Sequence, residues 1–357
     1  MAIQMLCESK TEQSCQLAEG VFPPRAISGK NYDFEEIKQQ LLRGPRVTNL
    51  APVFERIASG LTQRPRKEIY AAPEFLKQNQ ELADYHDILK RNFGTFLKHG
   101  CASIPFLLEE LVRIGVAVNK LAKTTETSNK PFSFYETSSA DGTAARTLAE
   151  YAAGRIYTLT DSPNEANEIE FKRLCSHSYS QFYKGCFADI TPSLIKQRYG
   201  HFSGGFDVIW ENTTFQMYGN FRDEQIAYVK RLLKPKGVMI FLEKMNHRDQ
   251  AEYLRRESIK DTNFKSLYFS AEEISKKKSD IIETMERGQT TIESFTRVAY
   301  RHFEHVHLIW NSLNFYHIAA SNDADSIEKF LSFLENPHVP EQFATTELGE
   351  LVPTIPL

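Results

Sequence analysis

Cysteine is scarce in this 357-residue chain and shows no pairing pattern. The five cysteines are scattered along the chain, and no C-x-x-C occurs; they are Cys7, Cys15, Cys101, Cys175 and Cys186. An odd, scattered set argues against a disulfide framework and against a zinc site, and it suits a reducing compartment. The amino-terminal stretch MAIQMLCESKTEQSC also lacks the charged start and apolar run of a secretory signal. We therefore expect a cytoplasmic protein.

Long apolar runs and a strong excess of charge are also missing. No stretch approaches the roughly 18 apolar residues of a membrane-spanning helix. The formal net charge is −3, which gives no electrostatic reason for a nucleic acid or an anionic membrane as a partner. The run Lys276-Lys277-Lys278 is interpreted as a solvated helix face. Neither a nucleic acid nor a membrane is therefore expected as a partner.

Four parts follow one another along the chain, without an internal repeat. Residues 1–30 form an arm, residues 31–130 are mostly helical, residues 131–322 alternate between strands and helices, and residues 323–357 hold one helix and a tail. The helical part is predicted to form a lid or a surface for homodimerisation beside the site.

Helical periodicity is clear in three segments of the second part. The first is YDFEEIKQQLL, with apolar residues at helical spacing. The second runs from Pro73, a suitable first helical residue, to Gly100. The third covers 103–122 and is strongly apolar on one side.

The third part contains seven short runs rich in apolar, aromatic and β-branched residues. The predicted strands are 132–137, 155–160, 181–186, 206–212, 237–244, 305–312 and 315–322. Helical stretches separate the first five, which predicts βαβ units and a parallel sheet covered on both faces. Only two residues separate the last two runs, so these must pair antiparallel. We expect an α/β fold: a doubly wound, Rossmann-like, seven-stranded sheet of five parallel strands plus a carboxy-terminal antiparallel hairpin.

The stretch FSFYETSSADGT joins the first predicted strand to the following helix. In a doubly wound sheet the ligand lies at the carboxyl ends of the strands, where amides of a helix amino terminus point at it. Small residues are needed there so that the backbone can approach the ligand. The stretch is not G-x-G-x-x-G, which disfavours a dinucleotide, and the chain has no G-x-x-x-x-G-K phosphate loop.

Acidic residues follow the next two predicted strands. Asp161 ends the second strand and could accept hydrogen bonds from a ribose diol, and Asp189 lies near the end of the third. Each acid alone could instead be a helix N-cap. Together with Glu136 at the end of the first strand, they favour a ligand site.

The order of these elements, and ETSSADG set against the pattern E-x-G-x-G-x-G, resemble the class I S-adenosylmethionine-dependent methyltransferases. VKRLLKPKGVMIFLEK is similar to the fifth-strand region of that family, and the resemblance covers about 131–322. A closer resemblance, to the carboxy-S-adenosylmethionine synthase branch, rests on five segments in the same order. They are NTTFQMY (212–218), LEK (242–244), FK (264–265), YFSAEEISKKK (268–278) and FEHVHLIWNSLNFYHIAAS.

The resemblance implies S-adenosylmethionine as cofactor and assigns seven residues to its site. The cofactor loop holds Glu136, Ser138, Ala140 and Gly142, the ribose acid is Asp161, the adenine-side acid is Asp189, and the asparagine beside the methionine part is Asn212.

Two departures from the family pattern are visible. Ser138 and Ala140 replace glycines, so the close approach of the backbone is expected to survive only if their φ angles are negative. The synthase branch carries a basic residue just after FK, which suits a carboxylate on the cofactor, whereas Ser266 stands at that place here. An unpaired carboxylate in a closed site is costly, so ordinary S-adenosylmethionine and methyl transfer are favoured.

A general base is needed only if the acceptor keeps its proton at neutral pH. Candidates near the strand ends are Glu211, Glu243, His247 and Tyr268. Three of them have a structural alternative: Glu243 could pair with Lys244, His247 could cap a helix, and Tyr268 could belong to the core.

No metal is expected. His305 and His307 could share one face of a strand, but no acid or cysteine is placed to complete a ligand set. Aromatic residues in the later segments, Phe315 among them, could wall an acceptor pocket, although core packing is the simpler interpretation of any single one.

Three hypotheses remain open. The first is a methyltransferase acting on a small organic acceptor by in-line displacement. The second is an enzyme like the carboxy-S-adenosylmethionine synthases, which a cation reaching the methyl position from elsewhere would favour. The third is a non-catalytic protein that binds S-adenosylmethionine.

Overall fold

The computed structural model describes residues 30–125 and 131–353. The arm predicted over residues 1–30 therefore lies outside the described residues, apart from its last residue. Of the five cysteines, Cys101, Cys175 and Cys186 lie in the described part, and all three are free thiols.

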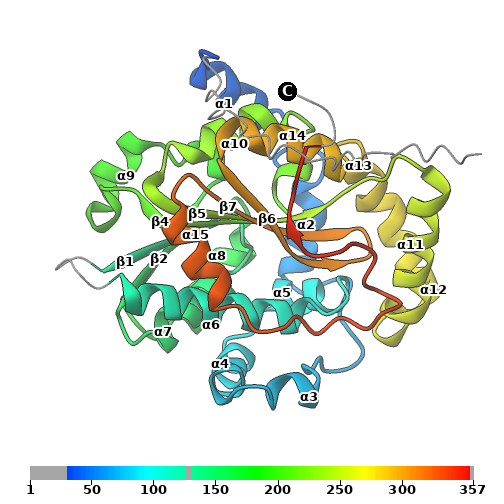
Figure 1. Ribbon diagram of the computed structural model, residues 1–357. Coiled ribbons are helices and arrows are strands. Elements are labelled where there is room, and N and C mark those ends of the chain that lie inside the picture. Colours follow the sequence, from blue (N-terminus) through cyan, green and yellow to red (C-terminus); the bar gives the residue numbers. More distant parts are fainter. Residues whose placement is uncertain (1–29, 126–130, 354–357) are drawn as a thin grey trace, which may run out of the picture.

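An eight-stranded mixed sheet forms the centre of the described chain. Its strands are β1 (Phe132–Thr137), β2 (Ile156–Ser162), β3 (Ser180–Lys184), β4 (Phe206–Asn212), β5 (Leu233–Lys244), β6 (His305–Ser312), β7 (Phe315–Ser321) and β8 (Gly349–Glu350). They lie in the order β3-β2-β1-β4-β5-β7-β6-β8 (Figure 1). The first five strands are parallel, and β7 lies antiparallel between β5 and β6.

This topology confirms the five parallel strands and the terminal hairpin. The predicted number of seven strands is wrong by one, because β8 adds to the edge of the sheet beside β6. A strand of two residues is too short to show an alternating pattern in the sequence.

Helices precede the sheet, connect its strands and follow it. Before β1 lie α1 (Phe34–Leu42), α2 (Ala51–Ala58), α3 (Pro73–Leu76), α4 (Gln80–Arg91), α5 (Thr95–Cys101) and α6 (Leu107–Thr124). The first four crossovers hold α7 (Thr143–Tyr151), α8 (Glu165–Leu174), α9 (Pro192–Arg198) and α10 (Arg222–Lys230). Between β5 and β6 lie α11 (Gln250–Asn263), α12 (Ala271–Lys277), α13 (Glu283–Glu286) and α14 (Ile292–His302), and α15 (Ala324–Ser332) follows β7. None of these described helices combines the length and apolarity that crossing a membrane requires.

The single helix predicted from Pro73 to Gly100 is wrong, because the structure has three helices there. Asn79 caps α4, since its side chain accepts a hydrogen bond from the amide of Glu81 at 3.0 Å. Gly94 precedes α5 and lies so close to Asp141 that a Cβ atom would come within 2.2 Å of a carboxylate oxygen. Local capping and one tertiary contact thus override the continuous helical periodicity.

Both faces of the sheet are buried, as a doubly wound fold requires. Along β5, Val238, Ile240 and Leu242 face one core, and Met239 and Phe241 face the other. The first core includes α6 and α7, and the second includes α10 and α14, on the opposite side of the sheet (Figure 1).

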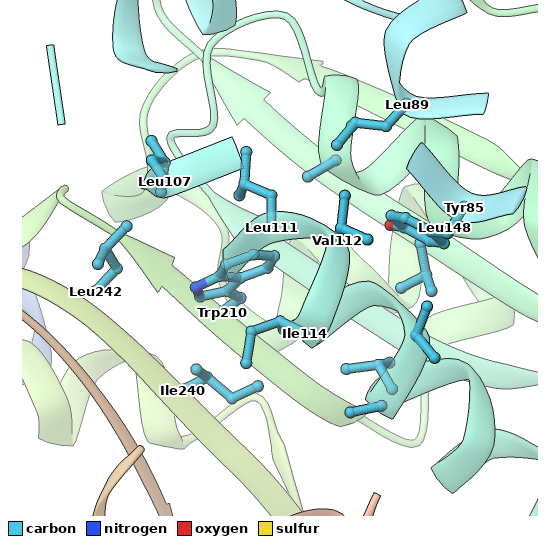
Figure 2. Close-up of a cluster of buried hydrophobic side chains, with 14 of the residues drawn as sticks. Tyr85, Leu89, Leu107, Leu111, Val112, Ile114, Leu148, Trp210, Ile240 and Leu242 are labelled. Atoms are coloured by element: carbon cyan, nitrogen blue, oxygen red, sulfur yellow. The ribbon is translucent and has the colours of Figure 1, made fainter. Parts of the chain in front are cut away.

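Helix α6 is the main cover of the first face. Figure 2 shows Leu107 and Leu111 of this helix beside Trp210, Ile240 and Leu242 of the sheet. Although the sequence placed α6 in the helical region, it shares a hydrophobic core with the strands.

Candidate functional site

The loop after β1 has a left-handed backbone at three positions, only one of which is a glycine. The φ angles are +47° at Ser138, +61° at Ala140 and +68° at Gly142. The condition stated above, negative φ at the two substituted positions, is therefore not met. Instead, two residues with side chains adopt the left-handed conformation, which costs about 1–2 kcal/mol for each. Their small size makes this conformation tolerable.

Asp161 holds Ser138 in this conformation. Its carboxylate accepts hydrogen bonds from the amide of Ser138 at 3.0 Å, from the Ser138 hydroxyl at 3.1 Å and from the Tyr135 hydroxyl at 2.7 Å. The carboxylate is fully buried, and burial raises the pKa of Asp161 to about 7. Asp161, the acid predicted to bind ribose, thus stabilises the loop through hydrogen bonds to Ser138. Its role toward a ribose stays a prediction.

Gly142 is the one loop position that admits no side chain. Its φ is positive, and a Cβ atom would lie 2.7 Å from Thr160 and 3.1 Å from Phe171. The residue also precedes the first turn of α7, so the loop passes directly into the helix. The retained glycine is explained by both conformation and space.

Glu136 and Asn212 join the ends of two neighbouring strands. Asn212 donates to one carboxylate oxygen of Glu136 at 3.1 Å, and the amide of Ala145 in α7 donates to the other at 3.1 Å. Burial raises the pKa of Glu136 to about 7. These contacts fix the loop between β1, β4 and α7.

A cavity opens at the carboxyl ends of β1, β4 and β5. Its walls are formed by the loop after β1, by the segment after β4 and by α5 with the residues next to it. Lysines at the end of β5 and in the segments that follow β5 complete the lining. The polar and loop residues that line it include Arg46, His99, Ser103, Ser138, Ser139, Ala140, Asn212, Thr213, Gln216, Lys244, Lys260, Lys265 and Lys277. The structure therefore brings Ser138, Ala140 and Asn212 together on one cavity, and their role toward a cofactor stays a prediction.

Asp189 does not reach this cavity. Its carboxylate lies 3.7 Å from the ammonium of Lys38 and accepts a hydrogen bond from the amide of Cys186 at 3.3 Å. Its predicted role at the adenine side is therefore not supported by a contact with the cavity, and it stays a prediction.

All four candidate bases, Glu211 included, lie outside the cavity lining as well. Both oxygens of Glu243 accept hydrogen bonds from Arg222, at 2.6 and 3.0 Å, so the alternative pairing with its neighbour Lys244 is wrong. His247 accepts from the amide of Asp249 at 3.0 Å, at the start of α11. Tyr268 lines a different cavity. Their catalytic roles stay untested, and the geometry gives none of them a direct path to a ligand in the main cavity.

Two buried side chains in the cavity lining were missed by sequence reasoning. Gln216 is buried, and neither its side-chain oxygen nor its nitrogen has a hydrogen-bond partner among the described residues. One terminal nitrogen of Arg46 is likewise unpartnered, while the other donates to Asn164 at 2.5 Å. Buried polar atoms without partners are costly, so both point to a polar ligand in the cavity. The one sequence signal for either residue is that Gln216 lies within the segment NTTFQMY, which carries the resemblance to the synthase branch.

Sequence reasoning also gave no indication that Lys244, Lys260, Lys265 and Lys277 line the cavity. Lys277 belongs to the run that was interpreted as a solvated helix face, and Lys276 and Lys278 are indeed exposed, but Lys277 is buried. Of the aromatic residues considered for the acceptor pocket, Phe315 lines the cavity. Among residues 30–125 and 131–353, no three potential ligands are arranged to hold a metal ion.

The strain in the loop makes a first prediction. Ala140→Gly is expected to stabilise the fold by about 0.5–1 kcal/mol, because relief of the left-handed strain exceeds the added entropy of the unfolded chain. Urea unfolding measures this. Ala149→Gly in α7 is the matched control and should lose about 1 kcal/mol. An Ala140→Gly variant as unstable as the control would contradict the strain at this position.

Comparisons with known proteins add similar structures but no family. No family model and no curated protein matches the chain. The chain is similar to the plantazolicin methyltransferase BpumL, solved with S-adenosylhomocysteine, at 13% identity over 70% of this chain and 100% of that one, with a TM-score of 0.41. It is similar to an arsenic(III) S-adenosylmethionine methyltransferase from Chlamydomonas reinhardtii at 14% identity, over 70% and 73% of the two chains, with a TM-score of 0.39. It is also similar to the cyclopropane synthase MmaA2 from Mycobacterium tuberculosis at 15% identity, over 80% and 79%, with a TM-score of 0.37.

Proposed function

We propose that the chain is an S-adenosylmethionine-dependent methyltransferase that acts on a small organic acceptor. The observation that carries the proposal is the left-handed loop from Ser138 to Gly142, which lines one cavity together with Asn212 and Gln216. Because the similar structures have TM-scores of 0.44 or lower, the proposal rests on residues of this chain.

The cavity fits the chemistry of the cofactor. Ser138 and Ala140 leave the backbone of the loop open to a ligand, and the amino terminus of α7 follows directly. The unpartnered amide of Gln216 offers one donor and one acceptor to a polar group such as an amino acid moiety. Asn212 has its amide nitrogen engaged by Glu136, so its oxygen is the atom it can offer.

The bound cofactor would supply an electrophilic methyl group on a sulfonium. The protein's part is to hold the acceptor in line with that methyl group and to exclude water. Residues from the helical region are placed to contribute to this, because Phe54, Phe96 and Leu97 line the cavity. We propose that the region before β1 serves as a lid over the site.

Calorimetric titration with S-adenosylmethionine and S-adenosylhomocysteine tests the proposal. Binding of both is expected, and Gln216→Leu is expected to weaken each by about tenfold, because a hydrogen-bonding pair is lost from a buried site. Thr262→Val, on an exposed turn of α11, is the control and should bind as the wild type does. Absence of heat at high micromolar ligand would contradict the proposal and both enzyme hypotheses.

A second candidate is an enzyme like the carboxy-S-adenosylmethionine synthases. The place expected to hold a cation, Ser266, is exposed and donates to the carbonyl of Thr262 at 2.6 Å. Lys244, Lys265 and Lys277 nevertheless bring ammonium groups to the same cavity from other positions. This observation favours a ligand with a carboxylate, and binding of the carboxylated cofactor more tightly than S-adenosylmethionine would support the candidate.

A further inference from the structure

Four lysines from separate segments converge on one wall of the cavity. Lys244 ends β5, Lys260 lies in α11, Lys265 follows α11 and Lys277 ends α12. Their exposed fractions are 1%, 3%, 3% and 7%. Buried ammonium groups require compensating charges or hydrogen bonds, so their partners decide what the cluster is for.

Two acids contact the cluster directly. Glu257 accepts from Lys244 at 2.8 Å and also from Lys260. Asp261 accepts from Lys265 at 2.8 Å and lies 3.7 Å from Lys260. Two carboxylates are thus shared among three ammonium groups.

A third acid, Glu286, stands further away. It accepts from the hydroxyl of Tyr253 at 3.0 Å, and that hydroxyl in turn accepts from Lys244 at 3.1 Å. Glu286 therefore acts on the cluster through an intervening side chain. Even with this acid counted, no carboxylate is left for the fourth lysine.

Within residues 30–125 and 131–353, the hydrogen-bond partners of the Lys277 side chain are neutral groups. Its ammonium lies 2.6 Å from Nε2 of His99 and 2.7 Å from the hydroxyl of Ser103. Nδ1 of His99 lies 3.1 Å from the carbonyl oxygen of Gln63, which places the ring proton there and leaves Nε2 to accept from Lys277. Among the described residues, no carboxylate lies within ion-pair distance of the Lys277 ammonium.

The protonation of the cluster reflects this shortage of negative charge. Burial, followed by the positive charges of Lys265 and Lys260, holds the pKa of Lys277 well below its usual range. Burial, followed by the charge of Lys260, lowers the pKa of Lys244 to about 8. An anion in the cavity would favour the charged forms and draw protons onto these lysines.

The cluster also lies beside the place of the proposed methyl donor. Asn212 and Thr213 at the end of β4 line the same cavity as Lys244 and Lys277, and so does Phe315. A sulfonium is itself a cation, so ammonium groups nearby would oppose its binding unless an anion lies between them. An acceptor with negative charge would serve both as the partner of the lysines and as the counter-ion of the sulfonium.

We propose that Lys277, with Lys244 and Lys265, binds an oxyanion carried by the methyl acceptor, so that the acceptor is a small carboxylate, phosphate or sulfate. This inference rests on the proposed function, because it assigns the acceptor half of the same cavity.

The test measures binding of inorganic sulfate to the protein saturated with S-adenosylhomocysteine. At pH 8 sulfate does not titrate, so calorimetry in two buffers of different ionisation enthalpy reports the protons taken up by the protein. We expect sulfate to bind with net proton uptake. Lys277→Met is expected to weaken sulfate binding about tenfold or more, because one charge-assisted hydrogen bond is lost, and to remove part of the uptake.

Three variants keep this test decisive. Lys276→Met, an exposed neighbour in the same helix, should bind sulfate as the wild type does. Lys277→Arg should restore much of the sulfate affinity, because the charge is retained. The melting temperatures of both Lys277 variants report whether they fold, and sulfate binding is measured with each variant saturated with S-adenosylhomocysteine.

The possible outcomes separate the two proposals. Equal sulfate affinity in the wild type and Lys277→Met, or no sulfate binding while S-adenosylhomocysteine still binds, would overturn the acceptor site and leave the proposed function standing. Failure to bind S-adenosylhomocysteine would overturn the proposed function instead. If the carboxylated cofactor binds more than tenfold more tightly than S-adenosylmethionine and excludes sulfate, the anion belongs to the cofactor and the acceptor assignment is overturned.

Discussion

Replacing Glu243 by leucine is expected to destabilise the fold by about 3–5 kcal/mol, because it leaves a buried arginine without its counter-charge. Arg222 and Glu243 are both buried and joined by two hydrogen bonds of 2.6 and 3.0 Å. Arg222 also donates to the carbonyls of Gly219 and Gly288, at 2.7 and 2.9 Å. The pair therefore ties the end of β5 to two loops that flank the cavity.

The double variant Arg222→Met, Glu243→Leu sharpens this prediction. It should be less destabilised than Glu243→Leu alone, because no charge is left unpaired. Arg255→Met is the control, since the ion pair of Arg255 with Glu252 on α11 is exposed and should change stability by less than about 1 kcal/mol. Urea unfolding of all four proteins gives the comparison. A loss in Glu243→Leu no larger than in the control would show that the pair does not hold these loops.

The same variants bear on catalysis. Glu243 was a candidate base, yet both of its oxygens are occupied by Arg222 and it does not line the cavity. If the double variant folds, it is expected to keep methyl transfer within about tenfold of the wild type, because the base contribution of a positioned side chain is typically 10²–10⁴-fold. A decrease in the rate of methyl transfer by about 10²-fold or more in a folded double variant would support Glu243 as the general base.

Asp161→Ala is the second change with a large expected effect. It removes the acceptor of three hydrogen bonds and leaves the Ser138 amide and the Tyr135 hydroxyl buried without that acceptor, at a cost of about 1–3 kcal/mol for each donor group. Because Asp161 holds the left-handed Ser138, the loop is expected to relax and the affinity for S-adenosylhomocysteine to fall by at least about tenfold. Unfolding experiments and calorimetry measure the two effects.

A thermodynamic cycle distinguishes support of the loop from a direct contact with ribose. If Asp161 acts only through the loop, the variant and the wild type should lose the same factor of affinity when the ribose 2′-hydroxyl of the ligand is removed. A smaller loss in the variant would show that the acid also binds the ribose. Glu328→Ala, an exposed acid on α15, should leave both stability and affinity unchanged. Unchanged affinity in a folded Asp161→Ala would contradict both roles.

Much of the fold was predictable from the sequence, because apolar runs alternate with helical stretches. The run at 237–244 carries apolar residues on both faces, which predicts a buried strand. The two-residue gap between 312 and 315 requires an antiparallel hairpin. The two-residue β8 and the breaks within 73–100 could not be predicted. A two-residue strand leaves no pattern, and the break at Gly94 depends on a contact with Asp141, which is distant in sequence.

The residues of the cofactor loop were predictable from the sequence, whereas the lysines proposed to bind the acceptor were not. Ser138, Ala140 and Asn212 follow predicted strands, and parallel strands bring their carboxyl ends to one edge. The backbone conformation of Ser138 could not be inferred from residue size, because it depends on buried hydrogen bonds to Asp161. Lys277 looked like one charge in an exposed run, and only the packing of α12 against His99 and Ser103 buries it.

A crystal structure of the protein with S-adenosylhomocysteine tests the central claim most directly. We predict that the homocysteine part lies against Ser138, Ala140 and Asn212 with a polar contact to Gln216, and that the sulfur faces the wall formed by the lysines. Electron density for the ligand at another place, or a loop whose residues 138 and 140 have left the left-handed region on binding, would contradict it.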